Sequence, residues 1–326
     1  NQVLSSDNPD GCKTENYYNR KGQLRMSRNT NQKIKNQYSY FNYDRLGRII
    51  ESGEIRTLET PQYFDLEKED FFTLMKKGTR VKTIYDTAYI VSTGNVDEQI
   101  NFEQENLRNR VSSIIRLSAG GGVESATQYS YDVEGNVKSL LQYQKEMGYK
   151  IMEYEYMALS GKITCIKYQP GRKDELRIRF AYDRQNRLVK TESSRDGVLW
   201  ENDARYSYYP HGAMSRMELG ENQVQGLDYY YTLQGYLKGV NCAETISEND
   251  PGIDGKLGDI HQYTAKDVYG YGMNYFDGDY QSIGYNGATD VMKLNGVINS
   301  AMKMGNNGVR GFFDGNISMT VGGIRI

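Results

Sequence analysis

Apolar and polar residues alternate along much of the chain with the period of a β-strand. In residues 152–156, Met152, Tyr154 and Tyr156 alternate with two glutamates, and residues 176–182 repeat the pattern with arginines on the opposite face. Side chains two positions apart lie on the same face of a strand, so this pattern predicts strands with one apolar and one charged face. The mean hydropathy of -0.74 agrees with sheets that keep one face in water.

A short phrase predicts how these strands are joined. Residues 43–49 read YDRLGRI, in which Asp44 precedes Gly47 by three positions. Asp favours the first position of a type I turn, because its carboxylate accepts hydrogen bonds from the backbone that follows. Glycine then takes the positive φ that begins a G1 bulge on the returning strand. The phrase therefore predicts the tip of a β-hairpin.

Variants of this phrase recur along the chain. The predicted positive-φ positions are Gly22, Gly47, Asn109, Gly135, Gly161, Asn186, Gly212 and Gly235. Neighbouring positions are 23 to 26 residues apart, except between Gly47 and Asn109. A nearly fixed period of this length indicates a repeat architecture. We therefore predict an all-β fold, an array of antiparallel hairpins laid edge to edge over residues 1–240, which forms a segment of a curved or spiralling β-shell.

The period lapses across an insertion at about residues 57–104. Its stretch PQYFDLEKEDFFTLMKKG places aromatic residues among charges and ends in Lys76, Lys77 and Gly78, which is typical of a short helix with a basic C-terminus. The helix would be either a plug or a padding insertion, and we favour padding. The sequence VKTIYD at residues 81–86 then predicts a returning strand. Asn109, in ENLRNRV, is the weakest copy of the tip.

Residues 241–326 predict an irregular, β-rich continuation in which the tips disappear. Asp250, Asp254 and Asp259 lie in one acidic loop, but the spacing and the closing Glu of an EF-hand are missing, so a solvated loop is the better interpretation. Whether any metal binds stays open. Residues 285–305 suit either one helix, capped by Thr289, or two strands split at Gly296.

Composition supports β-structure and excludes some functions. The chain has 29 Tyr and 34 Gly but only 5 Pro, and Tyr and Gly suit strands and tight turns. A net charge of -2 argues against nucleic acid as a partner. No apolar run reaches membrane-spanning length. The disulfide state of Cys12, Cys165 and Cys242 stays open, because an odd number of cysteines cannot pair completely.

The repeated phrases resemble the tyrosine-aspartate (YD) repeats of Rhs proteins, toxin-complex C subunits and teneurins. The resemblance covers most of residues 18–237, and stretches such as DPGIDGKLGD and YFDGDYQSIG are similar to YD-repeat proteins of Bacteroidetes-type bacteria. In that family the hairpin strip spirals into a hollow β-shell, which in toxins encloses a C-terminal effector. The resemblance implies the same role for this chain.

The sequence offers little catalytic chemistry, and we expect no enzyme and no cofactor. His211 and His261 are the only histidines, and neither belongs to a nucleophile motif. Some Rhs proteins cleave themselves near a DPxG-type motif, but Asp250-Pro251-Gly252 matches it only superficially. Exposed tyrosines on a sheet could stack on sugar rings, although a tyrosine row is first a ladder of cross-strand pairs.

Two hypotheses remain beside the enzyme. In the first, the chain is a structural segment of a secreted or surface-exposed bacterial YD-repeat shell, which encapsulates or displays a polymorphic toxin. Its partners are then the rest of a larger polypeptide, the toxin cargo and secretion-system components. In the second, it is part of a cell-surface adhesin that binds glycans or proteins. Because the chain begins with Asn, and neither end offers a cap for the repeats, we expect a processed or excised piece of a longer protein.

Overall fold

The computed structural model describes residues 4–7, 13–58, 65–68, 71–73, 75–89, 91, 102–241, 252–276 and 315–324. All strand pairings given for these residues are antiparallel. The predicted all-β class is therefore confirmed. Contacts divide the chain into two compact units.

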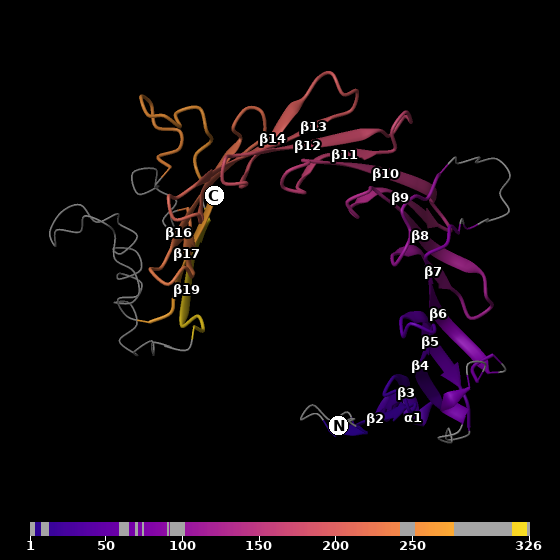
Figure 1. Ribbon diagram of the computed structural model, residues 1–326. Helices are drawn as coiled ribbons and strands as arrows, with labels where there is room; N and C mark the ends of the chain where they lie inside the picture. The colour runs from indigo at the N-terminus through magenta and orange to yellow at the C-terminus, as the bar shows by residue number, and fades with distance from the viewer. Residues whose placement is uncertain are drawn as a thin grey trace. The chain divides into compact units, whose positions relative to one another are not determined.

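Unit 1 comprises Asn1–Tyr156 and Ile166–Glu175. Its strands are β1 (Ser5–Asp7), β2 (Lys13–Tyr18), β3 (Leu24–Asn29), β4 (Gln37–Tyr43), β5 (Ile49–Arg56), β6 (Lys76–Tyr85), β7 (Val111–Leu117), β8 (Val123–Tyr131), β9 (Val137–Gln144) and β10 (Gly148–Tyr156). Each strand pairs with the next one in the chain, from β1 to β10 (Figure 1). The unit is thus a strip of consecutive hairpins.

Unit 2 comprises Met157–Cys165 and Leu176–Ile326. Its strands are β12 (Leu176–Tyr182), β13 (Leu188–Ser194), β14 (Glu201–Tyr208), β15 (Met214–Leu219), β16 (Gln225–Tyr231), β17 (Leu237–Val240), β18 (Tyr269–Asn274) and β19 (Met319–Ile324). They too pair in chain order, from β12 to β19. One further strand, β11 (Ile163–Tyr168), contributes residues to both units.

The described residues contain few helices, and these are short. The one α-helix in the described residues, α1 (Thr30–Ile34), joins β3 to β4 and begins with a capping box between Asn29 and Gln32. The described part of the predicted insertion contains a 3-10 turn, η1 (Asp65–Glu67).

The helix that we predicted to end at Lys76, Lys77 and Gly78 is wrong at this end, because all three residues open strand β6. Strand pairing accounts for the difference. Lys77 pairs with Ile55 of β5 and its ammonium reaches the Glu51 carboxylate, contacts that a helix would not offer. The returning strand predicted at residues 81–86 is confirmed, since β6 continues to Tyr85.

One face of unit 1 is covered by the segments that leave the strip, and we call it the padded face. After β5, Leu66 and Phe72 pack on Tyr38, Tyr40 and Ile55. After β6, Val91 packs on a second cluster, formed by Ile115, Ala126 and Tyr143. Both clusters lie on the same face of the sheet. Tyr40 pairs with Gly53, Gly53 with Arg80, and Arg80 with Leu117, so these four residues share one face. Ile115 lies two positions before Leu117 on the same strand and therefore faces the same side.

The opposite face of unit 1, which we call the bare face, is crossed by an unbroken row of paired residues. The row runs over seven strands, β4 to β10, and consists of Phe41, Ser52, Val81, Arg116, Ser125, Gln144 and Gly148. A parallel row one step nearer the tips contains Thr83, Ile114, Thr127, Gln142 and Lys150. Small and polar side chains therefore dominate this part of the bare face.

Candidate functional site

The eight predicted turn residues all adopt positive φ. The values are 79° at Gly22, 83° at Gly47, 60° at Asn109, 100° at Gly135, 65° at Gly161, 61° at Asn186, 99° at Gly212 and 88° at Gly235. Glycine tolerates this conformation without strain, and Asn tolerates it better than most other residues. The strand register shifts at the neighbouring pair, as where Tyr43 pairs with Ile49 while Asn42 pairs with Glu51. This is the geometry of a turn followed by a bulge.

The tip aspartates hold these turns from within. Asp183 Oδ1 accepts hydrogen bonds from the backbone N–H groups of Gln185 and Arg187, each at 2.9 Å, and Oδ2 accepts one from Arg187 Nε at 2.7 Å. The backbone bond from Arg187 and its guanidinium lower the pKa of Asp183. Asp44 is bonded in the same way to Leu46 and Arg48. The carboxylate thus satisfies turn donors that would otherwise face water.

The tip tyrosines explain why the phrase begins with Tyr rather than Phe. Six of their hydroxyls each donate to a backbone carbonyl two residues after the positive-φ residue of an earlier tip. The bonds, 2.7 to 3.1 Å long, run from Tyr43 to Leu24, Tyr85 to Ile49, Tyr131 to Val111, Tyr156 to Val137, Tyr182 to Ile163 and Tyr208 to Leu188. The accepting carbonyl lies just beyond the point where the strands of the two neighbouring hairpins stop pairing. Between β7 and β8, for example, the last pair on the tip side is Ser113–Gln128, and Val111 lies two residues beyond Ser113. We call this series of bonds the tyrosine ladder.

A basic residue reinforces several rungs of the ladder. Arg187, which follows Asn186, lies 4.6 Å from the ring centre of Tyr208 in the next tip. The same arrangement joins Arg110 to Tyr131 at 5.3 Å and Lys162 to Tyr182 at 5.1 Å. A cation over an aromatic ring is attracted to its π-face. Burial raises the pKa of Tyr131, so its hydroxyl stays a protonated donor at neutral pH.

The tip at Asn109 is split, which the sequence reading missed. Asn109 N–H donates to Asp86 Oδ1 at 2.6 Å, and Asp86 N–H donates to the Arg110 carbonyl at 3.1 Å. The Tyr-Asp half of this tip is therefore Tyr85-Asp86, whereas the stretch ENLRNRV supplies only the returning half. The letters YD at the end of the predicted strand 81–86 were the signal that could have revealed it.

The ladder also continues beyond Leu237, where the sequence predicted that tips disappear. Tyr275 follows β18, and its hydroxyl donates to the Leu237 carbonyl at 2.9 Å. Leu237 lies two residues after Gly235, so the rule of the earlier tips is kept. Tyr236 takes the place of the basic residue and lies 5.2 Å from the Tyr275 ring.

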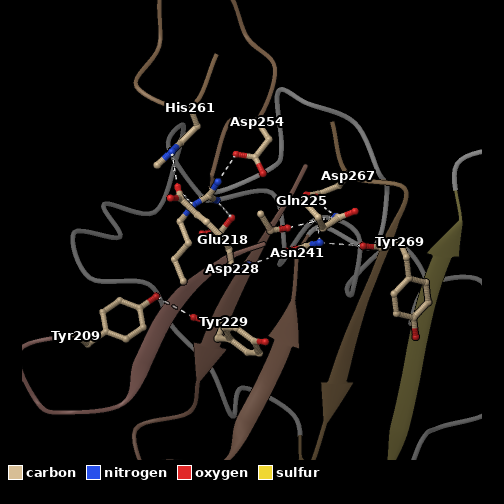
Figure 2. Close-up of polar contacts among 12 residues, drawn as sticks. Tyr209, Glu218, Gln225, Asp228, Tyr229, Asn241, Asp254, His261, Asp267 and Tyr269 are labelled. Carbon is tan, nitrogen blue, oxygen red and sulfur yellow. Dashed lines mark hydrogen bonds and ion pairs between the residues drawn. The ribbon is translucent and has the colours of Figure 1, made fainter. Parts of the chain in front are cut away.

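Unit 2 holds a second candidate, a buried polar cluster around Arg216 of β15. Its guanidinium contacts Asp228 of β16 at 2.5 Å, Asp254 at 2.6 Å and Glu218 at 3.0 Å. His261 Nδ1 also lies 3.1 Å from Glu218. Figure 2 shows Asp254 and His261 extending from the excursion 252–268 towards Glu218 and Asp228 on the strands. The cluster therefore attaches this excursion to unit 2.

Three hydrogen bonds of Asn241 extend the cluster towards β18. Asn241 accepts a bond from the Asp228 N–H at 2.8 Å and donates to Asp267 Oδ1 at 2.8 Å and to the Tyr269 carbonyl at 3.0 Å (Figure 2). Asn241 and Asp254 are completely buried. A buried amide that makes three bonds fixes the backbone where the excursion returns to the strands.

Glycines make room for the charges. A Cβ at Gly226 would come within 2.3 Å of both Arg216 and Asp254, and a Cβ at Gly252 within 2.3 Å of Arg216 and Asp228. Burial by itself would lower the pKa of Arg216, but the carboxylates of Asp228, Asp254 and Glu218 raise it instead. The guanidinium thus stays charged, and the cluster forms an ion-pair lock.

The structure also describes further candidates from the sequence. His211 stacks on Tyr209 at 5.3 Å, and Asp254 is bonded to Arg216. No described group of three His, Cys, Asp or Glu residues is arranged to hold a metal ion. Among the described helices, none has the length and apolar character needed to cross a bilayer. Cys12, Cys242, Asp250 and the ambiguous stretch 285–305 lie outside the described residues.

Comparisons with known proteins support the fold. No protein-family model and no curated protein matches the chain. The solved structure of TcdB2-TccC3 matches 73% of this chain and 11% of its own chain, with 14% identity and a TM-score of 0.50. The structure of TcdB2-TccC3-Cdc42 matches 73% and 10%, with 14% identity and a TM-score of 0.49.

A porin-like protein from Bacteroides uniformis matches 86% of this chain and 90% of its own, but with 8% identity and a TM-score of only 0.30. The likeness to TcdB2-TccC3 shows a shared β-fold. The chain spans about a tenth of the length of that toxin-complex chain.

Proposed function

We propose that this chain is a structural segment of a larger YD-repeat shell, secreted or exposed at a bacterial surface, which encloses or displays a toxin effector. The proposal assigns the chain no catalytic step. Its partners are the rest of the shell polypeptide and the enclosed cargo.

The observation that carries the proposal is the tyrosine ladder. Main-chain hydrogen bonds between neighbouring strands make each strip continuous. Near the tips, where this strand pairing stops, the tyrosine hydroxyls donate to backbone carbonyls that would otherwise have no partner in the protein. A wall built in this way has no gap between neighbouring hairpins. The fold shared with the toxin-complex structure TcdB2-TccC3 supports the same interpretation.

The adhesin hypothesis receives less support from the tyrosines. Six tip hydroxyls are already bonded to backbone carbonyls, and their rings are only partly exposed. They pack as a ladder and do not form an open platform for sugar rings.

The test uses the whole natural polypeptide that carries this chain, digested with a nonspecific protease under native conditions. If the wall encloses a cargo, the segment of the polypeptide that forms this cargo should resist digestion by the protease for as long as the wall stays folded. Combining Gly161→Val with Tyr182→Phe weakens two neighbouring features of the wall and is expected to shorten that survival at least fivefold.

Gly258→Val is the matched control. Gly258 also has positive φ, 88°, with nothing within 4 Å of its added Cβ, but it lies in the excursion 252–268, away from the tips. It should leave protection unchanged. If no stretch outside the wall is protected and the intact protein instead binds a glycan array, containment is wrong and the adhesin hypothesis replaces it.

A further inference from the structure

We propose that Lys238 of β17 and Asn274 of β18 join their side chains in an intramolecular isopeptide bond. The bond is a secondary amide between Lys238 Nζ and Asn274 Cγ, and it forms with the release of ammonia. It goes beyond the proposed function, because it is a covalent self-modification that a segment of a wall does not require.

The two side chains meet in the interior of unit 2. Lys238 and Asn274 are each only 2% exposed, although lysine is almost never buried to this extent unless its ammonium has a partner. Lys238 Nζ donates to Asn274 Oδ1 at 2.5 Å. Because the C=O bond adds about 1.2 Å, Nζ lies within about 3.7 Å of Asn274 Cγ. This is close to the separation of about 3–3.5 Å from which a nucleophile attacks.

Main-chain contacts hold both residues in place. β17 and β18 are paired through Gly239 and Gly272, and Lys238 lies one residue and Asn274 two residues beyond this pair. A Cβ at Gly239 would come within 2.8 Å of the β18 backbone, so glycine allows the two strands to approach closely. The backbone N–H and the hydroxyl of Ser318 both donate to the Asn274 carbonyl, at 2.7 and 2.8 Å. The amine and the amide are therefore held against each other before any bond forms.

The surroundings favour attack by the amine over attack by water. Burial disfavours the charged form of an amine, and the uncharged form is the nucleophile. Asn274 Nδ2, the leaving group, is buried and makes no hydrogen bond within the described residues, so its departure breaks no such contact. The neighbouring Gly239 and Tyr275 are buried as well, which limits the access of water to Asn274 Cγ.

The atoms of the reaction balance without a further reactant. The lone pair of Lys238 Nζ attacks Asn274 Cγ, so the Nζ–Cγ bond forms while the Cγ–Nδ2 bond breaks. One proton moves from Nζ to Nδ2, which leaves as ammonia. Nothing is oxidised or reduced. The product is an uncharged amide, which costs less to bury than an ammonium.

The bond closes a covalent loop that contains the excursion 252–268. It joins residues 36 positions apart, and the excursion lies between them. The ion-pair lock around Arg216 holds the same excursion by noncovalent contacts. A covalent link persists when such contacts are broken, and it restricts the unfolded chain as a disulfide does.

The experiment is acid cleavage of the 326-residue chain at Asp250-Pro251, the only Asp-Pro bond in the sequence. Dilute formic acid hydrolyses such bonds selectively, and this one lies between Lys238 and Asn274. With the isopeptide bond, the two fragments stay joined in a denaturing gel.

Lys238→Arg is the matched control, because it keeps the positive charge but lacks the reactive amine. It should release at least fivefold more of the free fragments than the natural chain. The gel is denaturing, so the comparison does not require the variant to fold. Equal release from both chains overturns the inference.

Mass spectrometry of the uncleaved chain provides a second measurement. Acylation of the lysine amine with loss of ammonia should lower the intact mass by about 17 Da. Trypsin does not cut after an acylated lysine, so Lys238 should appear in a branched peptide of residues 217–256 and 267–293, while the exposed Lys256 is cleaved completely. A mass loss accompanied by normal cleavage after Lys238 would place the lost ammonia elsewhere and contradict the bond.

Discussion

In unit 1 the segments that leave the strip are held by apolar side chains, whereas in unit 2 the excursion 252–268 is held by charged ones. Phe72 is completely buried against Tyr40, with the ring centres 4.8 Å apart. Asp254 is just as buried but contacts Arg216. Both contacts attach an irregular segment to a regular strip, yet their energetics differ.

The difference teaches that apolar attachment tolerates substitution in proportion to the volume lost, whereas ionic attachment fails when one partner is removed. Burying a side chain such as Phe72 gains free energy roughly in proportion to its area. A buried ion pair offsets a large desolvation cost, so it adds little net stability but is costly to break. The ionic lock should therefore specify the position of its segment more than it stabilises the fold.

The largest effect is expected from Phe72→Ala. Removing the ring leaves a cavity against Tyr40 and Ile55 and should lower the free energy of unfolding of unit 1 by about 3–5 kcal/mol. Hydrogen exchange of peptides from β4 and β5 measures it. Leu58→Ala is the control, because Leu58 is 87% exposed, and it should stay within about 0.5 kcal/mol. Similar losses for both variants would show that the apolar attachment does not stabilise the strip.

Asp254→Asn tests the ionic side of the comparison. It keeps the shape of the side chain but leaves the buried Arg216 charge less compensated, so unit 2 should lose about 3 kcal/mol. Trp200, the only tryptophan and a residue of unit 2, reports unfolding by its fluorescence. The exposed Glu201→Gln is the control. A loss below about 0.5 kcal/mol for Asp254→Asn would mean that the lock is not formed in solution.

The tips are common to both units and should respond alike in each. Gly47→Val, Gly135→Val and Gly161→Val should each cost about 1–3 kcal/mol, because Val adopts positive φ only with strain. Gly161 is the cleanest site, since nothing lies within 4 Å of an added Cβ. Asn186→Gly should change stability by only a few tenths of a kcal/mol. Unchanged melting of the three Val variants would count against the turn assignment.

A smaller effect is expected when one rung of the ladder is removed. Tyr131→Phe keeps the ring but loses the bond to the Val111 carbonyl, so the expected cost is about 0.5–1.5 kcal/mol by chemical denaturation. Tyr129→Phe on the same strand is the matched control, because the Tyr129 hydroxyl makes no hydrogen bond within the described residues. Equal costs would indicate that the ring, and not the hydroxyl, explains the repeated tyrosine.

The ladder predicts an alkaline limit and no change near neutral pH. Burial raises the pKa of Tyr43, Tyr131 and Tyr156 in the folded chain above the value of about 10 in the unfolded chain. A raised folded pKa contributes stability that is fully present below pH 10 and is lost as the pH rises through the folded pKa. Denaturation midpoints between pH 8 and 11.5 should stay level and then fall. Tyr131→Phe should fall less steeply above pH 10.

The predictability of the fold from sequence differs between the tips and the faces. Gly135 and Asp132 lie three positions apart, and local backbone geometry requires no more than their residue types, so the tip was readable. The split tip was not readable as one unit, because Asp86 and Asn109 are 23 positions apart and meet only when β6 and β7 pair. Similarly, the C-terminal end predicted for the helix, at Lys76 to Gly78, was wrong because pairing with β5 outweighs local propensity.

The sequence by itself determined the hairpins, since each turn depends on residues within a few positions of one another. It also required a tyrosine at each tip without revealing what the hydroxyl bonds, because the accepting carbonyl belongs to another hairpin. Only the tertiary structure decided which face is padded and that Arg216 meets Asp254, 38 positions away. Such pairs arise from the stacking of hairpins, and one-dimensional periodicity contains no information about which distant residues that stacking brings together.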